Sequence, residues 1–483
     1  MEMTKRLNIL LINPPCGPRT IGLRNIARIE PLGLEMVGAG VSADHDVRLV
    51  DMEVRSTDLA EMLRDFRPDV VGVTSEIVHV ETALAALRDV RRSAPGCLTV
   101  VGGHHPTLCP EDFDHESVDL IVIGEGIAAF AEICRIRANG GDDFTTVPGL
   151  RVRTRTGLKV TAPRPMPVTL DDQPFPDRSL AARYRHEYFY ILEDSVAAVR
   201  TSAGCSFPCI FCSCRVYSEG KFIPRSPELV FEEIRSLDED FIMFCDDHSF
   251  HDPERMRILG EMLLEAGVKK RYFAYGRADS IVENPEVFAL WAKVGLSLVM
   301  VGLEAVDEAA LKRTGKRSST GVNDDAVEIL GRLGIALSAG FLVEPHFTPA
   351  DFDAIDRYIA DRPAILLAEF TPLTPFPGTV LHRKTRHTLL TEDRQVYDLQ
   401  HFLMPTRLPP RQLYRLMLRS YRQVIIRMIL RLRLWRPGIL LSRRGRRVLS
   451  GLFRNHLAFL RAHRDVPRAV AQRSAATAQL EAP

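Results

Sequence analysis

Short apolar runs alternate with amphipathic segments over the first part of the chain. The runs predict strands at 7–13, 46–51, 70–74, 98–101 and 120–123. Between them, apolar residues return at steps of three and four, which predicts helices. Buried strands separated by helices are typical of a parallel sheet covered on both faces. Residues 1–140 are therefore expected to form a doubly wound α/β domain.

A second alternating series follows a Pro-, Thr- and Arg-rich stretch. Residues 141–190 lack sustained periodicity and predict a linker with a small hairpin. The next strands are predicted at 196–199, 241–245, 272–275, 298–301, 337–343 and 365–370. Six strand–helix units predict a partial (β/α)6 barrel of the TIM type over residues 191–400. The site of such a barrel lies at the carboxyl ends of its strands.

The C-terminal region, residues 401–483, is strongly basic, with 18 Arg, no Lys, one Asp and one Glu. Apolar residues recur in it at helical steps: Leu413, Leu416, Met417, Tyr421, Val424, Ile425, Met428 and Leu432. The first interpretation is a helix that closes the barrel and has solvated arginines. The second is an interfacial helix that is attracted to anionic lipid. Nucleic acid ranks third and is not expected as a partner, because no RNA-binding module accompanies the arginines.

Composition changes this picture little. The chain has 483 residues, 46% hydrophobic and 26% charged, with 63 basic and 62 acidic residues, which is typical of a globular protein. No apolar run reaches the roughly 18–20 residues of a membrane span, and the N-terminus lacks a signal-peptide layout. We expect a cytoplasmic protein, with peripheral contact at the inner membrane surface if the basic region is interfacial.

Four of the nine cysteines crowd into the segment RTSAGCSFPCIFCSC, directly after the strand at 196–199. Cys205, Cys209 and Cys212 could hold three irons of a 4Fe-4S cluster and leave the fourth iron open for a ligand. A structural zinc site prefers four ligands in two separated pairs. Cys214 is the available fourth ligand, but a single residue separates it from Cys212, which makes it a poor one. The five scattered cysteines are expected to be small core residues.

CxxxCxxC after the first strand of a partial barrel, with Phe211 between its last two cysteines, resembles the radical SAM superfamily. The resemblance implies that the open iron chelates S-adenosylmethionine and that reduction yields a 5′-deoxyadenosyl radical. It also implies that polar groups at the strand ends hold this cofactor. Any one of them could instead be a helix cap or a surface ion pair. The matching positions are Asp246, Asp247, Arg277, Asp279, Gly302, Glu304 and the TPFPGT segment at 374–379.

The N-terminal motifs NPP, GGHHPT and GEG resemble the Rossmann-like cobalamin-binding domain that precedes the barrel in some radical SAM proteins. The resemblance implies a cofactor-binding set of Asn13, Pro14, Thr74, Ser75, Gly102, Gly103, His104, His105, Gly124, Glu125 and Gly126. The chain departs from the family at Ile127, where GEGE is usual, and it lacks the D-x-H-x-x-G motif that supplies a histidine to cobalt. Adjacent histidines rarely chelate one ion, so the pair in GGHHPT is expected to donate to corrin amides or backbone.

Within this group the chain most resembles the hopanoid C-3 methylase type, through PLGLE, GGHHPTL, VGLEAVDEAALK, TPFPGT and LTEDRQVYDLQHFLMPTRLP. The resemblance implies a cobalamin-dependent C-methyltransferase that acts on an unactivated carbon of a small molecule or lipid. An electron donor such as flavodoxin or ferredoxin would reduce the cluster. The first alternative is a radical cyclase, dehydratase or rearrangement enzyme of natural-product or pigment biosynthesis. The second is a non-enzymatic cobalamin or iron-sulfur sensor or electron carrier.

No acid or base can be assigned from the sequence. Tyr272, Tyr275 and Glu369 lie in predicted strands and could face the barrel interior. A role in the core is the more common fate of such residues.

Overall fold

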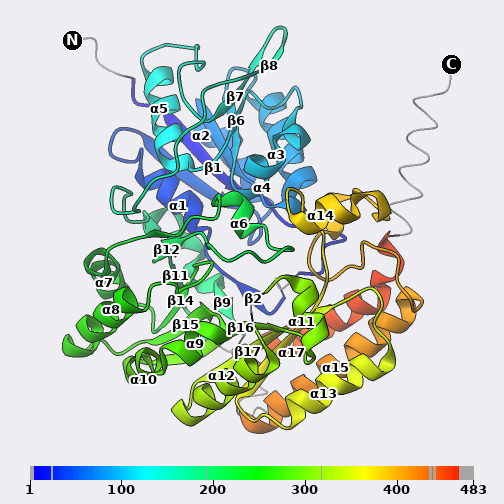
Figure 1. The fold of residues 1–483 in the computed structure, drawn as a ribbon. Coiled ribbons are helices and arrows are strands. Elements are labelled where there is room, and N and C mark those ends of the chain that lie inside the picture. Colours follow the sequence, from blue (N-terminus) through cyan, green and yellow to red (C-terminus); the bar gives the residue numbers. More distant parts are fainter. Residues whose placement is uncertain are drawn as a thin grey trace, which may run out of the picture. The chain divides into compact units, whose positions relative to one another are not determined.

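The computed structural model describes residues 5–22, 25–191, 193–316, 318–433, 438 and 442–466. The chain folds into two compact units. The first contains Met1–Thr20 and Glu30–Glu187, and the second contains Ile21–Ile29 and Tyr188–Pro483. Figure 1 follows the chain through both units, and each is described here by itself.

The first unit is built on a seven-stranded sheet in the order β3-β1-β4-β5-β6-β7-β8. Its strands are β1 Asn8–Asn13, β3 Asp46–Asp51, β4 Val70–Thr74, β5 Leu98–Gly102, β6 Leu120–Val122, β7 Leu150–Thr154 and β8 Gly157–Val160. Its helices are α1 Leu32–Ala39, α2 Asp58–Phe66, α3 Val80–Ser93, α4 His104–Leu108 and α5 Gly126–Ala138. The strands β3, β1, β4, β5 and β6 are parallel, so all five predicted strands and the doubly wound fold are confirmed.

The predicted linker belongs largely to this first unit. Its hairpin, β7 and β8, is present as predicted, but β7 pairs antiparallel with β6 and extends the sheet. The following 3-10 segment Arg178–Glu187 is tied to the same unit, because Arg178 forms an ion pair with the buried Glu30. The unit therefore ends at Glu187 and not near residue 140. The pairing between β6 and β7 joins segments that are far apart in the sequence, so local composition could not predict it.

The second unit contains a six-stranded parallel sheet in the order β11-β14-β15-β16-β17-β18. Its strands are β11 Val196–Val199, β14 Phe241–Phe244, β15 Arg271–Gly276, β16 Leu296–Glu304, β17 Ala336–Val343 and β18 Ile365–Pro372. The helices along it are α7 Pro227–Ser236, α8 Pro253–Glu265, α9 Ala278–Glu283, α10 Pro285–Val294, α11 Glu308–Thr314, α12 Thr320–Leu333, α13 Pro349–Ala360 and α14 Val380–Thr385. All six predicted strands are confirmed, and the fold is a partial barrel.

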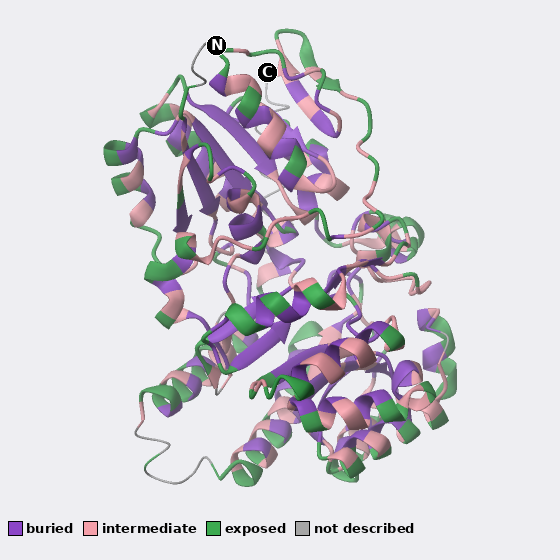
Figure 2. Cartoon of the chain, turned by 90° about the vertical axis from the view of Figure 1, so that its left-hand side faces the viewer, coloured by how far each residue is buried: buried purple, intermediate pink, exposed green. Residues whose placement is uncertain are grey.

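The two faces of this sheet have different environments. Alternate side chains such as Phe244 and Phe341 pack with Trp291 of α10 in the larger core, under the helices. The others, including Phe241 and Phe273, form a smaller inner cluster. Figure 2 shows the strands as mainly buried and the outer faces of the helices as exposed. The inner face is the side on which a partial barrel places its ligands.

A small antiparallel sheet contributes to the inner cluster. It joins β2, Ala27–Arg28, with β9, Phe189–Tyr190, and β10, Glu193–Asp194. Tyr190 packs there against Phe241 and Phe273. An early segment of the chain is thereby part of the second unit.

The C-terminal helices α15, Pro410–Arg431, and α17, Arg443–Ala462, complete the second unit. Leu413 and Met417 of α15 are fully buried in the larger core. The Tyr421 hydroxyl donates to the carbonyl of Phe370 in β18 and accepts from its amide, each at 3.1 Å. The helix that closes the barrel, the first of the three interpretations, is therefore confirmed for α15. Among the described residues, no helix is long and apolar enough to cross a membrane.

Candidate active site

The segment that carries the cysteines is held by two aspartates from the end of β14. Asp246 is buried, and its carboxylate accepts hydrogen bonds from the Thr201 amide at 2.8 Å, the Thr201 hydroxyl at 2.8 Å and the Ser202 amide at 2.9 Å. Asp247 accepts from the Gly204 amide at 2.7 Å. Both carboxylates are thus used to position the start of the cysteine loop.

Gly204 is the residue that permits the turn into this loop. Its φ is +80°, and a Cβ atom there would lie 2.2 Å from the Lys221 carbonyl oxygen. Only glycine tolerates both the backbone conformation and the close approach. The turn delivers Cys205, Cys209 and Cys212, all half-buried, onto the loop between β12, Ser202–Ala203, and α6, Cys214–Tyr217.

The three cysteines suit an iron-sulfur cluster better than a single ion. Among the described residues, the sets of three ligand atoms that lie within 4.8 Å of one another are Cys16–Glu53–His79 and His105–Cys109–Asp112. The three thiols of CxxxCxxC are spread more widely than that. A cubane takes one thiolate on each of three irons, so it fits wider spacing than a mononuclear site.

The thiol of Cys214 supports its neighbour. A hydrogen bond from this thiol, together with the amides of Cys214 and Arg215, lowers the pKa of Cys212 to about 7. Stabilising the thiolate in this way favours iron ligation, because the thiolate is the form that binds metal.

Arg277 brings positive charge to the same loop. Its guanidinium pairs with Asp279 at 2.6 Å, stacks 3.6 Å above the ring centroid of Phe207 and lies 3.8 Å from the Sγ atom of Cys209. The side chain is buried, and burial lowers its pKa, but the hydrogen bond to Asp279 and the charge of that carboxylate, with smaller contributions from Cys209 and Cys205, raise it above the usual value. A buried cation beside the cysteines suits an anionic cluster or the carboxylate of its ligand.

Aromatic rings surround Phe207. His248 and His251 meet its ring edge-to-face at 5.7 and 5.8 Å, and His251 stacks on Phe222 at 4.2 Å. Burial lowers the pKa of His248 to about 3, with a contribution from His251 and Arg277, so its imidazole is neutral. These rings pack together beside the cysteine loop.

Glu304 ends β16 in the left-handed region, with φ at +66°, which is rare outside glycine. Its carboxylate forms an ion pair with the buried Lys316 at 2.9 Å, and Lys316 also donates to the Gly302 carbonyl. The strand register shifts at this point. Lys316 reaches the cysteine loop electrostatically, because it lowers the pKa of Cys209 against the larger, opposing effect of burial.

In the first unit, glycines with positive φ follow the carboxyl ends of β5 and β6. Gly103 has φ of +110°, and a Cβ atom there would lie 2.9 Å from the Thr74 hydroxyl. Gly124 has φ of +83°, and a Cβ atom there would meet no atom within 4 Å. Space of this kind at strand ends is where doubly wound sheets bind bulky cofactors, so these residues fit cobalamin.

Several predicted cofactor residues of this unit make contacts within the protein. The GGHHPT segment, expected as a loop, contains the short helix α4, whose His105 is buried and hydrogen-bonds Asp112 at 2.7 Å. His104 lies 3.5 Å from Glu76. The remaining predicted residues of this unit are placed as follows: Asn13 donates to Asp51, the buried Ser75 donates to the Glu76 carbonyl, Glu125 caps α5 at Gly126, Pro14 is buried and Gly102 is half-buried. In the second unit, Phe211 is half-buried on the cysteine loop. Contact of any of these with a cofactor stays a prediction.

The comparisons with known proteins agree with both units. The B12 binding domain family matches residues 24–134, and the Radical SAM superfamily matches residues 199–359. The hopanoid C-3 methylase of Methylococcus capsulatus is 32% identical over 395 residues, which is 80% of this chain and 75% of that protein. The chain belongs to the cobalamin-dependent radical SAM methyltransferase family. Its cofactors are therefore a 4Fe-4S cluster, S-adenosylmethionine and cobalamin, as predicted.

Two further similarities extend this placement. The anaerobic magnesium-protoporphyrin IX monomethyl ester cyclase of Cereibacter sphaeroides is 25% identical over 385 residues, which is 77% of this chain and 61% of that protein. The solved structure of the cobalamin-dependent S-adenosylmethionine radical enzyme OxsB with aqua-cobalamin and S-adenosylmethionine bound has a TM-score of 0.68 at 15% identity. It covers 97% of this chain and 81% of that one. The likeness to OxsB supports the fold.

Some residues near the cysteines were missed by sequence reasoning. Lys316, Phe207 and His248 carry no motif of their own, and their partners lie far away in the sequence. The one local signal was Gly315, which ends α11 with φ of +70° and turns the chain so that Lys316 follows. The sequence alone could not identify Glu304 as the partner of this lysine.

Proposed function

We propose that this enzyme transfers a methyl group to an unactivated carbon of a polycyclic lipid and that it meets this substrate at an anionic membrane surface. When bound, the cluster and S-adenosylmethionine supply a carbon radical, and cobalamin supplies a carrier for the methyl group. The polycyclic lipid is proposed because the relative with 32% identity is named as a hopanoid C-3 methylase.

The residues of the second unit have separate tasks in this proposal. Cys205, Cys209 and Cys212 would hold the cluster, and the carboxylates of Asp246 and Asp247 fix the loop that presents them. Arg277, beside Cys209, is suited to the carboxylate of S-adenosylmethionine. The rings of Phe207, His248 and His251 would limit the access of water to this side of the loop.

The surface of the C-terminal helices carries the membrane part of the proposal. Large apolar side chains are more than a third exposed on α15, at Ile426 and Leu430, and on α17, at Leu449 and Phe453. Arg446 and Arg454 are exposed on α17, one before Leu449 and the other after Phe453. We call these six residues the α15–α17 surface. Apolar side chains flanked by arginines suit the boundary between anionic headgroups and acyl chains.

Reduction of the cluster needs one electron at a time, so the proposal includes a small donor such as flavodoxin or ferredoxin. The first test uses anaerobically purified protein reconstituted with iron, sulfide and cobalamin. It is incubated with S-adenosylmethionine, a strong reductant and a pentacyclic triterpene. We expect 5′-deoxyadenosine and S-adenosylhomocysteine together, and a triterpene heavier by one methylene group.

Other results would point to other functions. Formation of 5′-deoxyadenosine without S-adenosylhomocysteine would favour a cyclase, dehydratase or rearrangement enzyme. Failure of the reconstituted protein to cleave S-adenosylmethionine at all would favour a sensor or electron carrier. Methylation of a soluble sugar or peptide in preference to the triterpene would reject the lipid substrate.

A further inference from the structure

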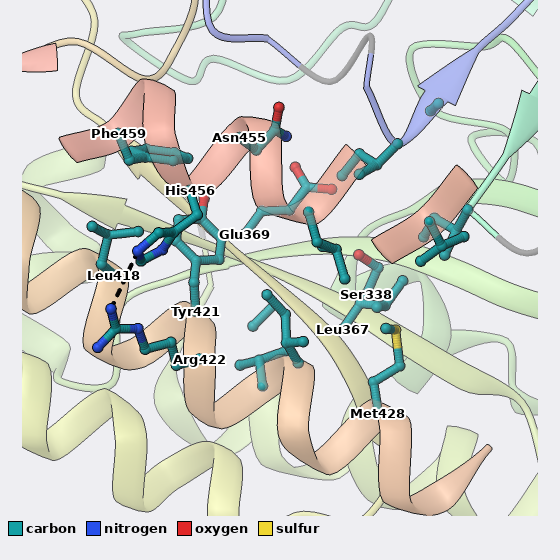
Figure 3. A pocket seen from close by; sticks show the side chains of 18 of the residues that line it. Ser338, Leu367, Glu369, Leu418, Tyr421, Arg422, Met428, Asn455, His456 and Phe459 are labelled. Atoms are coloured by element: carbon teal, nitrogen blue, oxygen red, sulfur yellow. Dashed lines mark hydrogen bonds between the residues drawn. The ribbon is translucent and has the colours of Figure 1, made fainter. Parts of the chain in front are cut away.

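A largely apolar pocket lies in the second unit, away from the cysteine loop, between β18, α15 and α17. The cavity has a volume of about 150 Å³, which is enough for part of a polycyclic molecule. The apolar lining includes Leu367, Leu418, Ile425, Met428, Leu452 and Phe459. Figure 3 shows β18, α15 and α17 contributing side chains to this space, with Arg422 and His456 hydrogen-bonded to each other at 3.2 Å.

Three polar groups in this lining lack partners within the described residues. The Ser338 hydroxyl is 1% exposed and makes no hydrogen bond. The Oε1 atom of Gln400, a residue that is 8% exposed, also has none. The Glu369 carboxyl forms no hydrogen bond or ion pair with any residue that the structure describes, and Figure 3 shows it extending from β18 toward α17. The Ser338 and Gln400 atoms are buried, and buried polar atoms without partners are rare in native proteins because each costs free energy. Glu369 is half-buried and lines the pocket.

These three groups define the ligand chemistry. A carboxylate oxygen and an amide oxygen are acceptors, and a serine hydroxyl can either donate or accept. Burial raises the pKa of Glu369, and even in its neutral form the carboxyl keeps an acceptor oxygen. The matching ligand is an apolar body that carries at least one hydrogen-bond donor.

We propose that this pocket binds one end of the apolar body of the substrate and that Glu369, Ser338 and Gln400 recognise a hydroxyl group on that end, so that the substrate is a polycyclic lipid alcohol and not the bare hydrocarbon. This inference rests on the proposed function and specifies its substrate. The pocket is lined by residues of the same two helices that carry the α15–α17 surface.

The pocket borders the inner cluster of the barrel, because Leu367 and Tyr190 belong to both. It therefore lies on the inner side of the sheet.

The test measures binding of a radiolabelled pentacyclic triterpene alcohol and of its parent hydrocarbon. Each is delivered from cyclodextrin to the reconstituted enzyme, without vesicles and without S-adenosylmethionine. We expect the wild type to bind the alcohol about tenfold more tightly, which is the value of roughly one hydrogen bond to an otherwise unpaired buried group. Glu369→Leu should remove this preference and leave hydrocarbon binding unchanged or stronger.

A matched pair of variants tests the location. Leu452→Trp places an indole inside the pocket, whereas Leu460→Trp makes the same change on the same helix at a side chain that is 45% exposed. We expect loss of binding of both ligands in the first and wild-type binding in the second. Equal affinity of the wild type for alcohol and hydrocarbon, or wild-type binding by Leu452→Trp, would overturn the inference.

Cleavage of S-adenosylmethionine, measured on the same preparations, separates the two proposals. Cleavage by an enzyme whose pocket binds neither triterpene would reject the pocket and leave the enzyme class standing. Triterpene binding without cleavage by the wild type would reject the proposed methyltransferase activity and leave the pocket as a lipid-binding site.

Discussion

Lys316 and Glu304 form an ion pair of 2.9 Å at the end of β16, with both residues less than a tenth exposed. The pair holds the backbone of Glu304 at a positive φ, which costs about 1–3 kcal/mol for a non-glycine residue. Lys316 also donates to the Gly302 carbonyl, so one ammonium group binds both Gly302 and Glu304 at the end of the strand. This strand end lies next to the cysteine loop, because Ile210 donates from its amide to the Thr314 carbonyl at 3.3 Å.

Removing the ammonium group should destabilise the second unit strongly. Lys316→Met leaves the Glu304 carboxylate buried and unpaired, and we expect a loss of about 3–5 kcal/mol in the free energy of unfolding. Lys312→Met, at an exposed lysine of α11, is the control and should change little. The double variant Lys316→Met/Glu304→Gln should recover part of the loss. Equal denaturant midpoints for Lys316→Met and Lys312→Met would show that the ion pair does not stabilise the fold.

The cysteines are expected to separate into two classes. Cys205→Ala, Cys209→Ala and Cys212→Ala should each abolish cleavage of S-adenosylmethionine and lower iron content, because each removes a proposed ligand. Cys214→Ala should keep iron content near the wild-type value, because its thiol supports Cys212 without being needed as a ligand. Iron analysis and visible spectra of anaerobic samples measure this. Loss of the cluster in Cys214→Ala would make Cys214 a ligand.

Most of the sheet architecture could be predicted because it is encoded locally. The runs at 70–74 and 196–199 match β4 and β11 residue for residue, since buried parallel strands read as continuous apolar segments. The run at 46–51 also matches β3, although Asp46, Arg48 and Asp51 interrupt its apolar residues. The ends of strands were predicted less accurately where the backbone departs from regular strand geometry. The predicted strand at 298–301 is β16, Leu296–Glu304, whose last residues carry a register shift and a positive φ.

Long-range pairings could not be predicted. Asp246 was expected as a cofactor group because it ends a strand, but its carboxylate is occupied by the backbone of Thr201 and Ser202. Glu369 was interpreted as a core residue, and the structure places it in a pocket formed with helices more than 40 residues away in the sequence. Both outcomes depend on which segments pack together, a property that neither spacing nor periodicity contains.

A buried histidine predicts how stability depends on pH. His401 is fully buried between Asp398 at 2.8 Å and Asp465 at 3.4 Å, and Asp398 also accepts from the Ile21 amide at 2.7 Å. Burial lowers the pKa of His401, but the two carboxylates outweigh it and raise the pKa to about 9. Because the folded pKa exceeds the unfolded value of about 6.5, the stabilisation is complete below pH 6.5 and is lost as pH rises through 9.

The expected size of this effect is roughly 3 kcal/mol between pH 6.5 and pH 10, from the difference between the two pKa values. Urea unfolding of the wild type and of His401→Gln over this range measures it. The wild type should lose stability as pH rises, and the variant should be less stable at pH 6.5 and show a flatter profile. Parallel pH profiles for the two proteins would mean that His401 stays neutral when buried.

The α15–α17 surface gives a membrane prediction that point variants can test. Deleting both C-terminal helices would not test membrane binding alone, because α15 supplies Leu413 and Met417 to the core and its removal would expose β18. Leu449→Ser/Phe453→Ser instead removes two exposed apolar side chains from α17 without touching the core. Burying a side chain of this size in lipid is worth about 1.5–3 kcal/mol, so the double variant should bind anionic vesicles at least tenfold more weakly.

Flotation with vesicles measures this binding. Changing the salt concentration and the lipid charge separates the contribution of the arginines from that of the apolar side chains. Wild-type binding should weaken between low and physiological salt and be poorer with neutral vesicles, since the arginine contribution is screened over roughly 8–10 Å. Leu264→Ser/Leu390→Ser, at two exposed leucines outside these helices, is the matched control and should float like the wild type. If both double variants float equally well, or if the wild type ignores anionic vesicles at low salt, the α15–α17 surface does not bind membranes. The lipid substrate would then depend on the similarity to the hopanoid C-3 methylase and on the pocket beside Glu369.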